Sequence, residues 1–484
     1  MTPQILTAAS FAYDDPTNGG GRGAAVVHPG SVPVGHALGQ SRFARFGRGL
    51  DSLSLAILIL AAGALMFRPS DLLPSLHRAP IYEALIAACL LTSIPRLLAI
   101  GATRSIRGNA IVALLMAMVP VVVLSHLAHG NTYDARLGGV DMLKACVFAM
   151  LVIALVDTTR RVHTMLLSVV TATFAVAGLS LLHYHGVLHV PALRAVEQAS
   201  VGAADEPGSS VLRLCGIGVF NDPNDFSLLL VISLVICGYA MCEGRGVIAR
   251  SLMALPLGLF TYALLLTHSR GGFISLVTAL LAYLHVRLGF RNALPVAILL
   301  FAGLLTVAWG RQTTFNLDNP EDTFQSRLEL WNHALDIFRV SPIFGVGQGK
   351  IVDTLGYVVH NSYLQAFSET GFLGGTVFAG LFVTVLVGLW RARPSDEGLS
   401  RLRPCVTAIV ASYAMGLMSL SRCYTVPTQL VIALGATYLS LGAHYGGLVL
   451  PRFDVRFVMR IMVASLTVLV GIYCIVRLLL HGAS

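Results

Sequence analysis

Long apolar runs, each of about 17–23 residues, recur along this chain and restrict its fold more than any other feature. Inside hydrocarbon a helix satisfies its own backbone hydrogen bonds, so each run predicts a spanning helix. The mean hydropathy of +0.75 and the 55% hydrophobic content agree with this. No polar stretch is long enough to fold around its own core. We therefore expect an all-α, polytopic integral membrane protein of about 12–13 transmembrane helices.

The apolar runs predict thirteen spanning helices. They are expected near residues 51–67, 81–100, 108–126, 141–157, 162–183, 226–242, 248–267, 271–287, 293–309, 372–390, 403–420, 425–442 and 458–480.

The cations of the chain are unevenly distributed between the loops. With the N-terminus in the cytoplasm, the tail and the even-numbered loops hold 20 of the 33 Lys and Arg residues, and the opposite face holds 12 over six loops. The positive-inside rule therefore predicts a cytoplasmic N-terminus. The turn 267–272 and the loop 310–371 then share the outer face. The basic balance reflects topology and lipid headgroups, so we expect the membrane as a partner and no nucleic acid.

The chain divides into four expected segments. Residues 1–48 contain Asn18-Gly19-Gly20-Gly21 and several prolines, which predicts a disordered cytoplasmic tail. Residues 49–309 form an N-terminal transmembrane bundle, 310–371 a large loop on the outer face, and 372–484 the C-terminal transmembrane helices.

The polar turn Thr267-His268-Ser269-Arg270-Gly271-Gly272 is wedged between two apolar spans. Gly271 and Gly272 open the next helix directly, so its free N–H groups and its positive dipole end lie beside the Arg270 guanidinium. Together they predict an anion site, and the planar fork of Arg suits a diphosphate. The alternative is an arginine that extends to the lipid headgroups.

The long loop carries a second group of candidates. Phe324, Leu328, Trp331, Leu335 and Phe338 repeat as one narrow apolar stripe, which predicts an interfacial helix lying on the bilayer.

Two cations accompany this predicted helix. Arg327 lies on the flank of its apolar stripe, where a neighbouring carboxylate or a headgroup is the alternative to a substrate. Lys350 follows the glycine-rich stretch after Ser341-Pro342 and is a further candidate for binding an anion.

His360 stands before a predicted helix start that Asn361 or Ser362 can cap. A histidine titrates near neutral pH, so His360 could take a proton from a sugar hydroxyl as a general base. Glu369 is a candidate for orienting it, although spacing alone does not establish this. The alternative is a structural histidine.

The stretch Asn221-Asp222-Pro223-Asn224-Asp225 is interpreted as a helix-capping pattern and not as a paired-acid metal site.

Neither the histidines nor the cysteines predict a cofactor. His183, His185 and His189 lack a cysteine or carboxylate to complete a metal set, so we expect no metal and no cofactor. Cys215 and Cys423 fall near outer-face loops, and whether they pair is left open.

The order of these pieces resembles the O-antigen ligase and O-antigen polymerase superfamily over about residues 211–392. The motifs that carry the resemblance are Thr267-His268-Ser269-Arg270-Gly271-Gly272-Phe273, Ser326-Arg327-Leu328-Glu329-Leu330-Trp331, Pro342-Ile343-Phe344-Gly345-Val346-Gly347, His360-Asn361-Ser362-Tyr363-Leu364 and Glu369-Thr370-Gly371-Phe372-Leu373-Gly374.

The resemblance implies a metal-independent, inverting membrane glycosyltransferase with a GT-C-like helical fold in the bacterial inner membrane. Its donor would be a glycan on undecaprenyl diphosphate at the periplasmic face, and its acceptor lipid A-core or a lipid-linked saccharide. Carried over by residue, Arg270 and Arg327 would clamp the diphosphate and His360 would activate the acceptor hydroxyl. Substrate contacts are expected from the residues that flank these three, namely Gly271, Gly272, Lys350, Asn361 and Glu369.

Two other classes of protein are alternatives. A secondary transporter would also be polytopic, but the centres of the predicted spans lack Asp and Glu. A lipid-linked saccharide binding or assembly protein without catalysis is the second alternative. Within the enzyme class, no residue separates a ligase from a polymerase.

Overall fold

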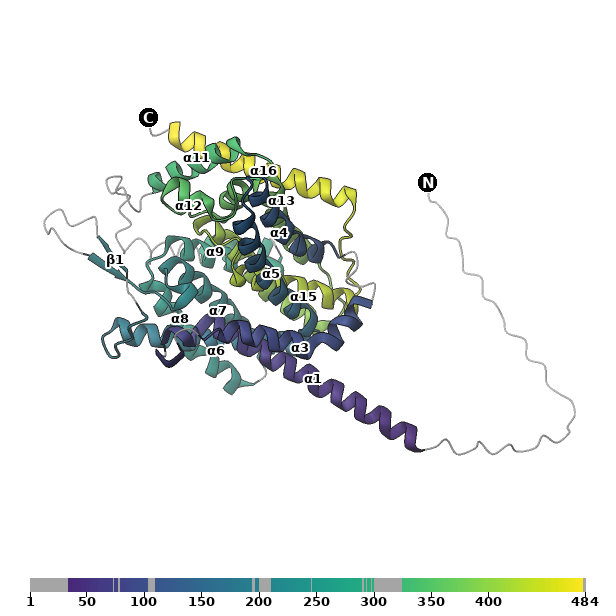
Figure 1. Cartoon of the computed structure of the whole chain (residues 1–484). Coiled ribbons are helices and arrows are strands. Elements are labelled where there is room, and N and C mark those ends of the chain that lie inside the picture. Colours follow the sequence, from purple (N-terminus) through teal and green to yellow (C-terminus); the bar gives the residue numbers. More distant parts are fainter. Residues whose placement is uncertain are drawn as a thin grey trace, which may run out of the picture. The chain divides into compact units, whose positions relative to one another are not determined.

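The computed structural model describes residues 34–72, 74–76, 79–102, 109–193, 196–199, 210–244, 246–289, 291–292, 294–296, 298–299 and 324–481 (Figure 1). The chain separates into two units, residues 1–48 and residues 49–484. In the first unit, residues 34–48 are helical, where the sequence predicted a disordered tail, and no proline interrupts them.

The described chain is almost entirely helical, as expected. The long helices are α1 (Val34–Phe67), α3 (Ile81–Ala102), α4 (Ala110–Leu127), α5 (Thr132–Leu155), α6 (Thr159–Tyr184), α7 (Pro223–Glu243), α8 (Val247–Leu266), α9 (Arg270–Leu288), α11 (Phe324–Val340), α13 (Ser362–Arg391), α14 (Glu397–Gly416), α15 (Val426–Tyr445) and α16 (Val455–His481).

Short elements connect the long helices. They are α2 (Pro69–Leu72), η1 (Pro74–Leu76), η2 (Gly218–Phe220), α12 (Lys350–Leu355) and η3 (Leu417–Ser419), with one antiparallel hairpin of β1 (Val196–Ala199) and β2 (Ser210–Arg213) that pairs Val196 with Arg213. Apolar runs do not predict this hairpin.

Eleven helices of the described chain are long and apolar enough to cross a membrane, and the protein is a polytopic membrane protein. They correspond to eleven of the thirteen predicted spans. The predicted span 248–267 is also helical, but its apolar part, Arg250–Leu266, is shorter than the others. Most of the predicted span 293–309 lies outside the described residues.

Helix α13 is packed on several sides by other helices. It contacts α14 and α15, and it also contacts α4, α11 and α16, which lie around it in Figure 1. Tyr363, Phe378 and Phe382 pack ring against ring within it, with centroids 5.5–6.3 Å apart. Burial of such large rings holds the start of α13 firmly in place.

The apolar stripe of α11 is present but faces protein. Leu328, Ala334 and Leu335 are buried, and α11 packs against α13 and α16. Phe338 meets Phe367 of α13 edge to face. Part of the stripe is therefore covered by neighbouring helices, and the placement of α11 at the bilayer surface stays a prediction.

Helix α13 is broken at Gly371, which has a left-handed backbone (φ 66°, ψ −168°). The preceding loop crosses the break. Gly347 N–H donates to the Glu369 carbonyl at 2.8 Å, and Phe372 N–H donates to the Pro342 carbonyl at 2.7 Å. A Cβ atom at Gly345 would lie 2.3 Å from the Glu369 carbonyl carbon, so only glycine fits there. The break separates a short first segment, residues 362–370, from the spanning part of α13.

The helix starts of α7, α13 and α15 are hydrogen-bonded to the loop 417–425, and the start of α9 is hydrogen-bonded to that of α7. We call this region the polar end. At the opposite end, Glu243 of α7 pairs with Arg287 of α9 and Arg401 of α14. The polar turn 267–272 and the segment around His360 both lie at the polar end, in agreement with their predicted placement on one face.

Candidate functional site

Helices α9 and α13 begin in the same way. Ser269 caps α9 by accepting the Gly272 N–H at 3.0 Å, and Asn361 caps α13 by accepting the N–H groups of Tyr363 and Leu364. The residue before each cap is a histidine with a left-handed backbone, His268 at φ 50° and His360 at φ 53°. Side chains other than glycine enter this region at a cost, so the surrounding contacts must hold both residues there.

The capping interpretation of residues 221–225 is confirmed. Asp222 accepts the N–H groups of Asn224 and Asp225, and Pro223 is the first residue of α7. The next side chains reach other helices. Asn224 Oδ1 accepts the Ser269 hydroxyl at 2.8 Å, which joins the start of α7 to the start of α9.

Arg213, which was not a candidate from the sequence, hydrogen-bonds to both sides of the contact between α7 and α9. Its Nε donates to the Thr267 carbonyl at 2.9 Å and its Nη2 to Asn224 Oδ1 at 3.1 Å. The side chain is buried. Arg213 therefore fixes the turn that carries Arg270.

Arg270 is exposed at the first position of α9. Within the part of the chain that the structure describes, it forms no hydrogen bond or ion pair. A Cβ atom on Gly271 would lie 2.2 Å from Ser419 Oγ, and one on Gly272 would lie 2.3 Å from Ser227 Oγ. The two glycines thus let α9 approach α7 and the loop 417–425 closely, and the cation beside them is available to an anion.

The loop 417–425 holds the start of α13. Ser421 Oγ accepts the His360 N–H at 3.0 Å. Ser362 Oγ accepts the Arg422 N–H at 2.8 Å and donates to the Leu420 carbonyl at 2.6 Å. Half-buried His360 is therefore fixed by a loop between two other helices.

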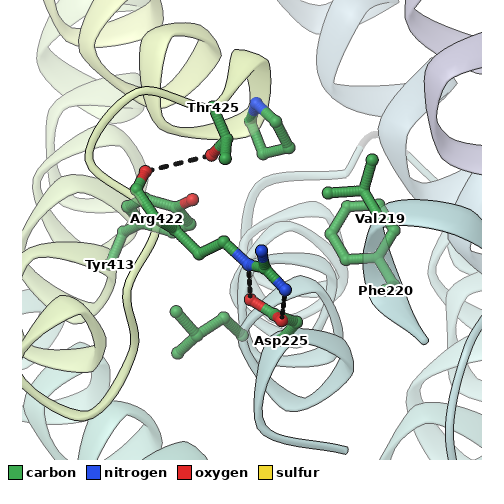
Figure 2. Close-up of a pocket in the computed structure, with 8 residues that line it drawn as sticks. Val219, Phe220, Asp225, Tyr413, Arg422 and Thr425 are labelled. Atoms are coloured by element: carbon green, nitrogen blue, oxygen red, sulfur yellow. Dashed lines mark hydrogen bonds and ion pairs between the residues drawn. The ribbon is translucent and has the colours of Figure 1, made fainter. Parts of the chain in front are cut away.

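Arg422 binds Asp225 through both arms of its guanidinium, Nε to Oδ1 at 2.8 Å and Nη2 to Oδ2 at 2.5 Å (Figure 2). Asp225 is almost completely buried, and the carboxylate raises the pKa of Arg422. The third guanidinium nitrogen points away from Asp225 (Figure 2). A small pocket beside this pair is lined by Val219, Phe220, Asp225, Leu228, Tyr413, Arg422, Thr425 and Pro427.

Arg327 is half-buried on α11, one turn before Trp331. Trp331 Nε1 donates to the carbonyl of Val359 at 3.1 Å, next to His360. Helix α11 therefore contacts the chain directly before His360.

Lys350 and Glu369 lie in a neighbouring part of the polar end. Glu369 is fully buried and accepts both hydrogen bonds of the Gln365 amide at 3.3 Å. Lys350 pairs with Asp134 of α5 at 2.9 Å and with Asp353 at 3.3 Å. Hydrogen bonding to Asp134 raises the pKa of Lys350, so its charge is already matched by carboxylates.

Two further features of the described residues concern thiols and metal ligands. Cys215 and Cys423 are buried free thiols. The described chain holds no group of three or more His, Cys, Asp or Glu side chains that could bind a metal ion.

The structure thus links Arg270, His360 and the helix that carries Arg327 to one set of helix starts. The sequence analysis missed Arg213, Asp225 and Arg422. One signal for Arg422 exists, because Ser421-Arg422 lies between two apolar spans as Ser269-Arg270 does.

Comparison with known proteins supports the resemblance. Residues 255–379 match the family model Wzy_C, described as O-Antigen ligase. This segment is an O-antigen ligase domain. It runs from within α8 past the break in α13 and contains Arg270, Arg327 and His360, whereas Arg213, Asp225 and Arg422 lie outside it. No curated protein matches the chain.

Proposed function

We propose that the protein transfers a glycan from undecaprenyl diphosphate to a hydroxyl of an acceptor sugar. The observation that carries the proposal is the junction of two helix starts. Arg270, unpaired in the described chain, and His360 both stand at starts that contact the loop 417–425, the first through Gly271 and Ser419 and the second through Ser421. A cation for an anionic leaving group and a base for a hydroxyl are the two groups that this transfer needs.

The reaction is a direct displacement at the anomeric carbon. The acceptor oxygen forms a bond to this carbon while the bond to the diphosphate oxygen breaks, and the configuration inverts. The hydroxyl proton passes to His360. The leaving diphosphate keeps the electron pair of the broken bond, and Arg270, Arg327 and the dipole of α9 stabilise its charge.

The remaining predicted residues have supporting roles. Asn361 holds the start of α13 and thereby His360, and Gly271 and Gly272 allow the close approach of α9. Glu369 secures the short first segment of α13 beneath the loop 342–351. Lys350 contributes a weak attraction for the anionic donor, because Asp134 and Asp353 already share its charge.

The site is proposed to face the periplasm, with the N-terminus in the cytoplasm of a bacterium and the protein in its inner membrane. The distribution of arginine between loops supports this orientation. The four proposed segments are the tail 1–48, the bundle 49–309, the catalytic loop 310–371 and the C-terminal helices 372–484.

Alanine substitution tests the assignment. Arg270→Ala, Arg327→Ala and His360→Ala should each reduce glycan transfer below the level visible on gels in a strain lacking the chromosomal gene, while the protein still accumulates in the membrane. Transfer is measured from the glycans displayed on gels, and accumulation by immunoblot. Wild-type transfer by all three variants would refute the proposal. Donor binding without turnover in the wild type would favour a binding or assembly protein.

The same deletion strain identifies the acceptor. Full-length chains retained on undecaprenyl diphosphate indicate a ligase, whose acceptor is lipid A-core. Single unpolymerised repeats on the lipid indicate a polymerase of O-antigen or exopolysaccharide, whose acceptor is another lipid-linked saccharide.

A further inference from the structure

Two consecutive residues in the first turn of α7 reach two different parts of the polar end. Asn224 binds the turn that carries Arg270, and Asp225 binds the loop that holds His360. We infer that Asn224 and Asp225 are positioning residues, which together set the separation between the leaving-group cation and the base. The inference rests on the proposed function and concerns two residues outside the matched segment 255–379.

The first arm runs from Asn224 to Arg270. Asn224 Oδ1 accepts the Ser269 hydroxyl at 2.8 Å, and the same Ser269 oxygen accepts the Gly272 N–H at 3.0 Å as the cap of α9. Ser227, one turn further along α7, donates to Ser269 at 3.1 Å. The cap of α9, and with it the backbone of Arg270, is therefore fastened to the first turn of α7.

The second arm runs from Asp225 to His360. The bidentate hydrogen bonding of Asp225 fixes both the position and the plane of the Arg422 guanidinium. The Arg422 backbone N–H is held by Ser362, and the preceding residue, Ser421, accepts the His360 N–H. His360 has a left-handed backbone, which residues other than glycine adopt only at a cost, so it depends on contacts of this kind.

Stability alone is a weak reason for this arrangement. Asn224 and Asp225 are 9% and 6% exposed, near the start of a helix that is apolar enough to span the membrane. A buried ion pair contributes little net stability, because desolvation of both charges offsets their attraction. The two side chains instead fix a distance. Because both leave the same rigid helix turn, they hold the turn 267–272 and the loop 417–425 at a constant separation.

Substitutions of Asn224 and of Asp225 should change the kinetic constants differently. Rates are measured as release of undecaprenyl diphosphate by full-length protein in liposomes, with lipid-linked glycan extracted from the deletion strain as donor. Asp225→Asn should lower kcat by about tenfold to a hundredfold and leave the donor KM within about twofold, because it displaces the base. Asn224→Ala should lower kcat and raise the donor KM together, because it displaces the cation that binds the diphosphate and stabilises its charge as it leaves.

A double-mutant cycle separates positioning from general damage. If Asp225 acts through His360, Asp225→Asn should cause no further loss in a His360→Ala background, where the general base, worth about 10²–10⁴-fold, is already absent. Ser421→Ala removes the hydroxyl that accepts the His360 N–H and should behave in the same way. It also keeps the test decisive if Asp225→Asn does not fold.

Ser412→Ala is the matched control. Ser412 is a buried serine of α14 whose hydroxyl bonds within its own helix, to the Ile409 carbonyl at 3.1 Å, and its variant should be as active as the wild type. The inference would be overturned if Asp225→Asn and Ser421→Ala both had wild-type kcat. It would also be overturned if either substitution lowered kcat further in the His360→Ala background. Neither result would affect the proposed function. Full activity of His360→Ala itself would overturn both.

Discussion

The two ends of the helical bundle use charge differently. At the opposite end, Arg96 of α3 pairs with Asp51 and Asp157, and Asp157 also pairs with Arg161. Asp157 is 40% exposed there. At the polar end, the side chain of Asp225 is only 7% exposed and its partner, Arg422, is 197 residues away in the sequence.

The difference indicates that the ion pairs at the opposite end hold segments together, whereas the pair at the polar end fixes their exact position. Half-exposed pairs are screened by solvent and tolerate small movements, so those of the opposite end tie adjacent loops together without fixing them closely. Buried pairs with two parallel bonds tolerate little movement. The bundle therefore fixes geometry most closely where the proposed chemistry occurs.

The largest expected effect comes from comparing two arginines of one helix. Arg270 begins α9, and Arg287 lies in its last turn beside Glu243. Arg270→Ala should reduce kcat for glycan transfer by about 10²–10³-fold, the usual effect of removing one group that stabilises developing negative charge. Arg287→Ala should stay within about twofold, because it serves only as an anchor. Equal losses in the two variants would contradict the comparison.

Removing one carboxylate at each end sharpens the contrast in stability. Asp225→Ala leaves Arg422 largely buried without its partner and should lower the free energy of unfolding by about 2–3 kcal/mol, less than for a fully buried cation because Arg422 is one-third exposed. Asp157→Ala should lower it by about 1 kcal/mol or less. Denaturant titration of both variants in the same detergent provides the measurement. A larger loss for Asp157→Ala would reverse the assignment of the two ends.

Two left-handed glycines probe packing at the two ends. Gly345→Ala places a Cβ atom 2.3 Å from the Glu369 carbonyl carbon, and a backbone atom cannot easily move, so we expect a loss of about 2 kcal/mol or more. Gly289, which ends α9, has no atom within 4 Å of the point that a Cβ would occupy, so Gly289→Ala carries only the backbone cost, about 1 kcal/mol. Thermal unfolding followed by fluorescence-detected gel filtration compares the two. Similar midpoints would show that the loop 342–351 adapts.

The smallest expected effect is that of Lys350→Gln. The substitution should raise the donor KM by about twofold, because Asp134 and Asp353 already balance the charge. The pKa of Lys350 is raised, so the lysine stays charged and paired at neutral pH and, on the alkaline side, loses its charge only above the ordinary lysine pKa of about 10.4. A KM increase of tenfold or more, measured at pH 7, would move Lys350 into the main anion site.

Local features of the fold were predictable from sequence. Apolar runs located the spans, and the start of α9 directly after Ser269 followed from a polar turn with no linker. A cap at Asn361 or Ser362, of which the structure uses Asn361, and the capping role of residues 221–225 followed from residue type and position. Each of these signals lies within a few residues of the structure that it specifies.

Contacts between distant segments were not predictable in this way. Nothing near Asp225 indicates that Arg422 will pair with it, and nothing near Arg213 indicates that it will brace the turn 267–272. The apolar stripe of α11 showed correctly that one face is covered, but hydrophobic periodicity cannot distinguish lipid from α13 and α16 as the cover. Distances within the candidate site depend on tertiary packing, which periodicity and capping rules do not contain.

The shared backbone of His268 and His360 has a consequence for variant libraries. Asparagine and glycine accept a left-handed φ more readily than other residues, so either one preserves the chain path at both positions. A screen that reports only folded protein should therefore enrich the same two replacements at 268 and at 360. A screen for sugar transfer should retain these replacements at 268 and reject them at 360. Comparing the variants that survive each screen therefore distinguishes residues required for the backbone conformation from residues required for proton transfer.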